Sequence, residues 1–179
     1  MEGTMMVWMQ RFNLYLALAV VLTLLCGCQS HKKDKATAAV RVHIQTNADT
    51  VGASQQVNVL RSNPVVVNIA RTPILTEANL VSAKILETPG GFAIALQFDE
   101  TGGWTLEQFS AANPGGHFVI FGQWGEKLAN GRWLAAPLIT KRVTNGMLVF
   151  TPDASREEAD QFVLGLNRVA AKIQKHQLK

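Results

Sequence analysis

Cysteine is nearly absent from this sequence: among 179 residues there are only Cys26 and Cys28. The chain that follows residue 28 therefore has no cysteine, which excludes a disulfide framework and a thiolate metal site there. The four histidines are far apart, and no HxH or HExxH motif or clustered carboxylates accompany them. We expect no metal site and no cofactor, and a domain stabilised by its apolar core alone.

Motifs typical of catalysis and of nucleic-acid binding are also missing. No serine lies in a Gly-x-Ser-x-Gly elbow, and the pairs Gly102-Gly103 and Gly115-Gly116 belong to neither a GxGxxG nor a Walker pattern. We interpret these glycines as loop residues. The adjacent acids Asp99-Glu100 are expected to cap a turn rather than to catalyse. The net charge is +4, but the basic residues form no stripe interleaved with aromatics. We therefore expect neither an enzyme nor a nucleic-acid-binding protein.

One long apolar run is present, between residues 14 and 25, after Arg11. A positive residue, a core of ~7–15 apolar residues and a small residue before the cut are typical of a secretory signal. The alternative is a transmembrane anchor, extended by the apolar residues near positions 5–9. The run itself is shorter than the ~20 residues that a spanning helix needs. We therefore assign residues 1–27 to a signal peptide.

The end of this run resembles the lipobox of bacterial lipoproteins, with Leu25 at position −3, Gly27 at −1 and Cys28 as the first mature residue. The resemblance implies cleavage before Cys28 and its acylation by fatty acids such as palmitate. Cys26 is the alternative lipidation site, although it follows a bulky leucine. The implied location is the cell envelope, anchored to a membrane and facing the periplasm. Gln29 is not the aspartate that retains lipoproteins at the inner membrane in well-studied bacteria, so the choice of membrane stays open.

The next two segments differ in composition. Residues 28–38 are polar and alanine-rich, which predicts a flexible tether. Residues 39–75 predict a small N-terminal β region, because β-branched or alternating segments at 40–44, 57–60 and 65–69 are separated by turn-forming residues.

Residues 76–175 predict a larger α+β module. Period-2 alternation over residues 92–98, after the tight turn at Pro89-Gly90-Gly91, predicts a hairpin over residues 80–98. Thr105 and Gln108 fit a capping box, which predicts a short helix from residue 105. Strands follow at 117–124 and 132–139, where Pro137 indicates an edge or a bulge. Asn145-Gly146 predicts a hairpin turn into the strand 147–150.

The clearest helix is the last one. Ser155 and Glu158 form a second capping box, and apolar residues recur at i, i+3, i+4 and i+7 from Ala159 to Ile173. The order of elements predicts an α+β fold: a mainly antiparallel sheet with two helices packed on one face, preceded by the small N-terminal β region.

These elements resemble a known family over residues 76–172. The most specific segment is Ala-Pro-Leu-Ile at 136–139, followed by a glycine-turn strand at 145–151 and the Ser-Arg-Glu-Glu-Ala helix start at 155–159. The segment is similar to the head subdomain of the first periplasmic domain of SecD, an accessory subunit of the bacterial preprotein translocase. The resemblance does not extend to the membrane-spanning part of SecD. It implies a non-enzymatic module that contacts translocating, unfolded polypeptide or Sec translocon subunits.

Four aromatic residues form the candidate binding surface: Trp104, Trp124, Trp133 and Phe121. Core packing is the alternative role for them, because buried indoles also need a partner for the N–H group. A structural or interaction lipoprotein that binds an unrelated envelope partner is the alternative function. The sequence leaves the partner and the oligomeric state open.

Overall fold

The computed structural model describes residues 37–48 and 52–177. The predicted signal peptide, the lipidation site Cys28 and most of the predicted tether lie outside the described residues. The last two residues of that tether, 37 and 38, belong to the first strand. No helix in the described part of the chain is long and apolar enough to cross a membrane.

The described residues form nine strands, two α-helices and two short 3-10 helices. In chain order they are β1 (Thr37–Ile44), β2 (Ser54–Val59), β3 (Val65–Ala70), β4 (Leu75–Thr76), η1 (Glu77–Asn79), β5 (Leu80–Thr88), β6 (Gly91–Phe98), α2 (Glu100–Ala112), β7 (Phe118–Gly125), η2 (Glu126–Leu128), β8 (Asn130–Ala135), β9 (Met147–Phe150) and α3 (Arg156–Gln177).

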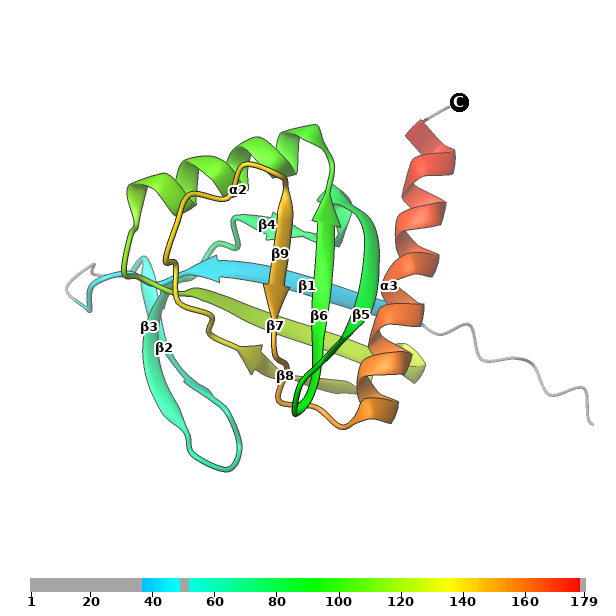
Figure 1. Ribbon diagram of the computed structural model, residues 1–179, viewed down its shortest axis with the longest axis horizontal. Helices are drawn as coiled ribbons and strands as arrows, with labels where there is room; N and C mark the ends of the chain where they lie inside the picture. Colours follow the sequence, from blue (N-terminus) through cyan, green and yellow to red (C-terminus); the bar gives the residue numbers. More distant parts are fainter. Residues whose placement is uncertain (1–36, 49–51, 178–179) are drawn as a thin grey trace, which may run out of the picture. The chain divides into compact units, whose positions relative to one another are not determined.

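The largest sheet has the strand order β4-β1-β7-β8 (Figure 1). Strand β1 pairs antiparallel with β7 along its whole length, from Thr37 opposite Gly125 to Ile44 opposite Phe118. The sequence analysis assigned residues 39–75 to a small N-terminal β region, and β1 of that region pairs with β7 of the segment assigned to the larger module. The pairing joins segments about eighty residues apart, which local sequence patterns do not encode.

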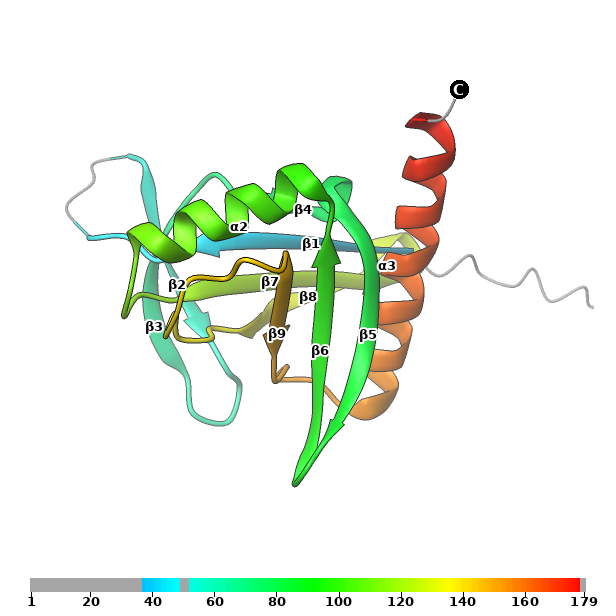
Figure 2. The same ribbon diagram turned by 45° about the horizontal axis from the view of Figure 1, so that its top comes forward.

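A second sheet has the order β5-β6-β9 (Figure 2). The β5–β6 pair confirms the predicted hairpin over residues 80–98. Strand β9 pairs with β6 rather than with the strand that precedes it in the chain. The prediction that Asn145-Gly146 joins two paired strands is therefore wrong, because β8 ends at Ala135 and pairs with β7 instead.

The third sheet is the two-stranded ribbon β2-β3. Its inward side chains Val57, Val59, Val67 and Ile69 pack with Val119 of β7 in a small core of their own. The ribbon thus covers part of the outer face of the β4-β1-β7-β8 sheet. The opposite face of that sheet carries the main core, which includes Val40, Val42 and Ile120.

Helix α2 begins five residues earlier than predicted, so the predicted start at Thr105 is wrong. Asp99 is the N-cap, and its carboxylate accepts a hydrogen bond from the Gly102 N–H at 2.7 Å. A Cβ atom at Gly102 would lie 2.9 Å from the Phe98 Cβ. Glycine is a poor helix former, but here it permits the close approach of the helix to the end of β6.

Helix α3 begins as predicted. Ser155 Oγ accepts a hydrogen bond from the Glu158 N–H at 3.3 Å, and the Glu158 carboxylate accepts one from the Ser155 N–H at 2.8 Å. The apolar stripe of α3 is buried against β1, β5 and β7 (Figure 1). A Cβ atom at Gly165 would lie only 2.8 Å from the Ala38 Cβ, so glycine permits the close contact between α3 and β1.

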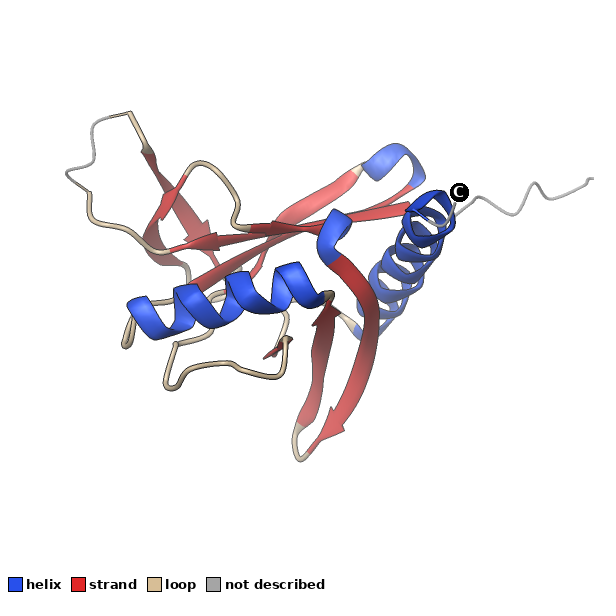
Figure 3. Cartoon of the chain, turned by 90° about the horizontal axis from the view of Figure 1, so that it is seen from above, coloured by secondary structure: helices blue, strands red, loops and turns tan. Residues whose placement is uncertain are grey.

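The predicted α+β class is confirmed, with mainly antiparallel strands and two α-helices. The strands of the described residues form three sheets rather than one. The two helices contact different strands: α3 lies against β1, β5 and β7, and α2 lies against β4 and β6 (Figure 3).

Candidate functional site

Strand β9 has a partner on one side only, since it lies at the edge of the β5-β6-β9 sheet. The Phe98 N–H donates to the Gly146 carbonyl at 3.0 Å, and Gln97 lies opposite Met147. In an antiparallel pair this arrangement directs the backbone groups of Leu148 and Phe150 toward β6. The N–H and carbonyl groups of Val149 therefore face away from the sheet, where an added strand can pair with them.

The other outer strand of this sheet, β5, is covered. The side chain of Asn167 in α3 accepts from the Ala83 N–H at 2.8 Å and donates to the Ala83 carbonyl at 2.9 Å. Gln174 of α3 donates to the Val81 carbonyl at 3.4 Å. Helix α3 thus satisfies the edge of β5, as natural proteins commonly do for exposed edges. Within the described residues, no side chain or backbone group bonds in this way to the outward N–H and carbonyl groups of Val149.

The side chains of β9 alternate between core and solvent. Leu148 and Phe150 are buried, whereas Met147 is 36% exposed and Val149 is 44% exposed. Such an exposed apolar edge strand is a template for pairing with another chain.

A groove runs along this edge. Two pockets of about 450 Å³ each share Pro137 and Val149 in their walls. We call their combined surface the β9 groove. It extends from Leu60, Ala135 and Ala136 past Pro137 and Leu138 to residues 140–145 and Met147. Leu138 and Leu60, both in its walls, are 53% and 41% exposed. The groove is therefore open to solvent and largely apolar.

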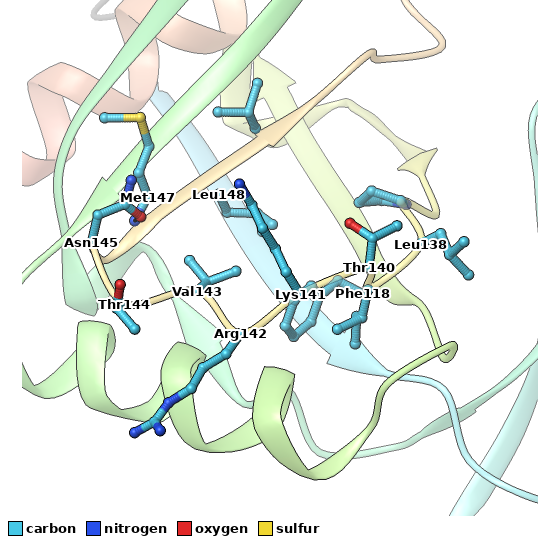
Figure 4. Close-up of a pocket in the computed structure, with 13 residues that line it drawn as sticks. Phe118, Leu138, Thr140, Lys141, Arg142, Val143, Thr144, Asn145, Met147 and Leu148 are labelled. Carbon is cyan, nitrogen blue, oxygen red and sulfur yellow. Dashed lines mark hydrogen bonds between the residues drawn. The ribbon is translucent and has the colours of Figure 1, made fainter.

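The charged side chains of the β9 groove are both basic: Lys141 and Arg142. Arg142 forms an ion pair with Glu107 of α2, and in Figure 4 its side chain is directed toward that helix. Lys141 extends away from Arg142 (Figure 4) and has no ion-pair partner among the described residues. The groove therefore presents one unpaired positive charge beside an apolar edge strand.

The turn before β9 is held in place by Gln97. Its side-chain amide lies 3.2 Å from each of the Phe98, Asn145 and Gly146 carbonyl oxygens. Gly146 has φ +64, a left-handed conformation that favours glycine. The Asn145 side chain accepts from the Met147 N–H at 3.1 Å. These bonds fix where β9 starts.

Of the four predicted aromatic residues, Trp124 is not on the surface. It is 1% exposed and packs against Phe162 of α3, with ring centroids 5.8 Å apart. The Arg132 guanidinium lies 4.9 Å from the centre of the indole. Trp124 is a core residue, which was the alternative role for this set.

The remaining three do not form one surface. Phe121 and Trp133 are adjacent, with ring centroids 5.0 Å apart, on the outer face of the large sheet. Trp104 is 64% exposed on α2, and no ring contact of the described residues joins it to the others. None of the four lines the β9 groove.

His43 lies beneath Trp133 and is 4% exposed. Its Nδ1 atom donates to the Ala70 carbonyl at 2.7 Å, because a carbonyl only accepts. Burial lowers the pKa of His43, and the Arg41 charge acts in the same direction, while the bond to Ala70 opposes them. The folded protein therefore favours the neutral imidazole more strongly than an exposed histidine would.

This burial predicts a pH dependence. Below the ordinary histidine pKa of ~6.5, this histidine binds a proton more readily in the unfolded chain than in the folded protein. The free energy of unfolding therefore decreases as the pH is lowered. Urea unfolding between pH 7.5 and 5.5 is expected to show a steeper fall for the wild type than for His43→Gln. Equal slopes for the two proteins would contradict the assignment.

Sequence reasoning missed the β9 groove for a definite reason. The expected hairpin through Asn145-Gly146 would have paired strand 147–150 with strand 132–139 and left no open edge there. Two features argue against such a hairpin: Pro137 interrupts the earlier strand, and eleven residues separate β8 from β9. That length is unusual for a hairpin loop.

The sequence matches no protein-family model. It also matches no curated protein.

The fold is similar to that of solved SecDF structures. One, of SecDF as a membrane component that enhances protein export, has a TM-score of 0.53 and 20% sequence identity, over 80% of this chain and 70% of that chain. A crystal structure of SecDF in a super-membrane-facing form has a TM-score of 0.50 and 20% identity, over 73% of this chain and 19% of that chain. The described domain thus shares the fold of a SecD-like module.

Proposed function

We propose that this chain is a lipid-anchored, non-enzymatic binding module of the cell envelope that assists protein export by contacting translocating polypeptide. The observation that carries this proposal is the open edge of β9 beside an apolar groove. An unfolded chain that leaves a membrane exposes backbone and apolar side chains of many sequences. An edge strand binds an added strand through main-chain hydrogen bonds, which every sequence can form.

The contacts of the β9 groove favour an extended occupant. Val149 offers an N–H donor and a carbonyl acceptor in the direction away from β6. The exposed side chains of Met147 and Leu138 offer apolar contacts on either side. Lys141 favours segments that carry an acidic residue. Four residues of an added strand span about 13 Å, which matches the length of β9.

The role in export is supported by the shared fold. One of the similar structures is of a SecDF described as enhancing protein export, and the described domain shares its fold. The anchor is supported by the lipobox-like residues 25–28. Three acyl chains on Cys28 exceed the two signals that stable anchoring needs, and they keep the module at the membrane surface.

Photo-crosslinking in cells that make the full chain tests the proposal. A photoreactive residue is placed at Leu138, in the β9 groove, or at Leu164 on α3, as the matched control; these positions are 53% and 49% exposed. We expect adducts with exported polypeptides at position 138 during active export, and none at position 164. A single stoichiometric partner unrelated to export would instead favour the alternative, an interaction lipoprotein of the envelope.

The anchor has its own matched pair of variants. Metabolic labelling with a palmitate analogue is expected to be lost in Cys28→Ala and retained in Cys26→Ala. The crosslinks at position 138 should weaken in Cys28→Ala, since the module then lacks its acyl anchor. Retained labelling in Cys28→Ala would contradict lipidation at this residue.

A further inference from the structure

A separate pocket lies on the outer face of the β4-β1-β7-β8 sheet. Its volume is about 450 Å³, and the residues that line it are Arg41, His43, Gln55, Arg71, Pro73, Phe121 and Trp133. None of these residues lines the β9 groove. Pockets of ~300–1,000 Å³ are typical of small-molecule sites, so this volume is sufficient for a ligand the size of an aromatic acid.

The floor of this pocket is set by strand register. Arg41 of β1 lies opposite Phe121 of β7, and Phe121 lies opposite Trp133 of β8. Directly opposite residues share one face of a sheet, so a guanidinium, a phenyl ring and an indole form a row across three strands. His43, two residues after Arg41, lies on the same face and packs edge-on against Trp133, with ring centroids 5.3 Å apart.

The wall of the pocket comes from the β2-β3 ribbon and the segment after it. Arg71 Nε donates to the Ser54 carbonyl at 3.0 Å, which holds this guanidinium at the rim. The Arg71 N–H also bonds to the Ala53 carbonyl at 3.0 Å. The two terminal nitrogens of Arg71 are not used in these bonds. The arginine is thus positioned by local contacts before any ligand arrives.

The charge of the pocket is uncompensated. Its lining contains two arginines and no acidic residue. Arg41 and Arg71 take part in no ion pair among the described residues. Four other arginines of the described chain form ion pairs, among them Arg132 with Glu158 and Arg156 with Glu87, whereas the exposed Arg168 does not. The pocket therefore presents two guanidiniums that are available to an anion.

We infer that this pocket binds an oxyanion carried on an aromatic group, with the anion held by Arg41 and Arg71 and the aromatic group packed on Phe121 and Trp133. Guanidiniums bind carboxylates and phosphates through paired, charge-assisted hydrogen bonds. Aromatic pairs add attraction beyond the area that they bury. Carboxylate and phosphate groups are both recognised in this way, so an experiment must show which of the two anions the pocket prefers. The inference does not depend on the proposed role in export.

Nuclear magnetic resonance titration of the full chain in detergent tests the inference, with the Trp133 indole N–H signal as the readout. The probes are 3-phenylpropionate and phenyl phosphate, and 3-phenylpropionamide is the uncharged control of matched shape. We expect saturable shifts of the Trp133 signal with at least one anion, and a Kd at least tenfold higher for the amide. The anion with the lower Kd identifies the preferred group.

Arginine variants assign the anion contacts. Arg41 and Arg71 are both exposed. Arg41→Gln and Arg71→Gln are each expected to raise the Kd for the anion at least tenfold. Arg168→Gln, an exposed arginine on α3, is the matched control and should leave the Kd unchanged. The inference is overturned if the amide binds as tightly as the anions, if neither anion shifts the Trp133 signal, or if the double variant Arg41→Gln/Arg71→Gln binds like the wild type. Unchanged backbone N–H signals of the protein outside the pocket show that the variants are folded.

Discussion

Replacing Trp124 with alanine is expected to lower the free energy of unfolding by about 3–5 kcal/mol, the range for truncating a buried large aromatic side chain. Trp124 is 1% exposed, packs edge-on against Phe162 and lies beneath the Arg132 guanidinium. Its removal opens a cavity between β7 and α3 and leaves both neighbours with fewer contacts. Urea unfolding followed by circular dichroism measures the effect.

The matched control for Trp124 is the same substitution at Trp104, which is 64% exposed on α2. Trp104→Ala is expected to change the free energy of unfolding by less than about 0.5 kcal/mol, as for surface sites away from special features. A loss of less than about 1 kcal/mol for Trp124→Ala, or equal losses for the two variants, would contradict the assignment of Trp124 to the core.

Replacing Val149 with proline is expected to weaken the binding of unfolded polypeptide at least tenfold, which corresponds to about 1.4 kcal/mol. Proline removes the N–H that faces away from β6, and its ring obstructs an incoming strand. Proline is tolerated on edge strands where the lost donor faces solvent, so the pairing of β9 with β6 remains. Fluorescence anisotropy with labelled, reduced and carboxymethylated α-lactalbumin measures the Kd.

Two further variants of β9 separate binding from folding. Val149→Thr retains the N–H and the β-branched shape, so it should bind within about twofold of the wild type. Leu148→Pro removes the N–H that pairs with β6 and the buried leucine side chain, and it should lower the free energy of unfolding by about 2–5 kcal/mol, the range for truncating a buried leucine. If Val149→Pro is folded and binds like the wild type, polypeptide does not pair with β9.

Local patterns in the sequence predicted most of the elements. The alternation around Pro89-Gly90-Gly91 predicted the β5–β6 hairpin, and the capping box at Ser155 and Glu158 predicted the start of α3. The start of α2 was missed because Gly102 is unfavourable in a helix interior, while its contact with Phe98 admits no larger residue. That contact is tertiary, and no local propensity reports it.

Pairings between distant segments could not be predicted in the same way. Strand β1 pairs with β7, and β9 pairs with β6. In both cases the pairing depends on the packing of the whole domain and not on the local sequence. The candidate groove depends on the second of these pairings. The row of Arg41, Phe121 and Trp133 depends on the register of three strands, so aromatic content alone indicated two of its members but not the arrangement.

Amide hydrogen exchange in β9, measured by nuclear magnetic resonance with and without the unfolded probe, tests the central claim most directly. If polypeptide adds to the edge of β9, the outward N–H of Val149 should exchange at least tenfold more slowly in the complex. The inward N–H of Leu148, already paired with β6, and the amides of α3 should change little. Bound probe with unchanged exchange at Val149, or with protection confined to another surface such as α2 around Trp104, would contradict the claim.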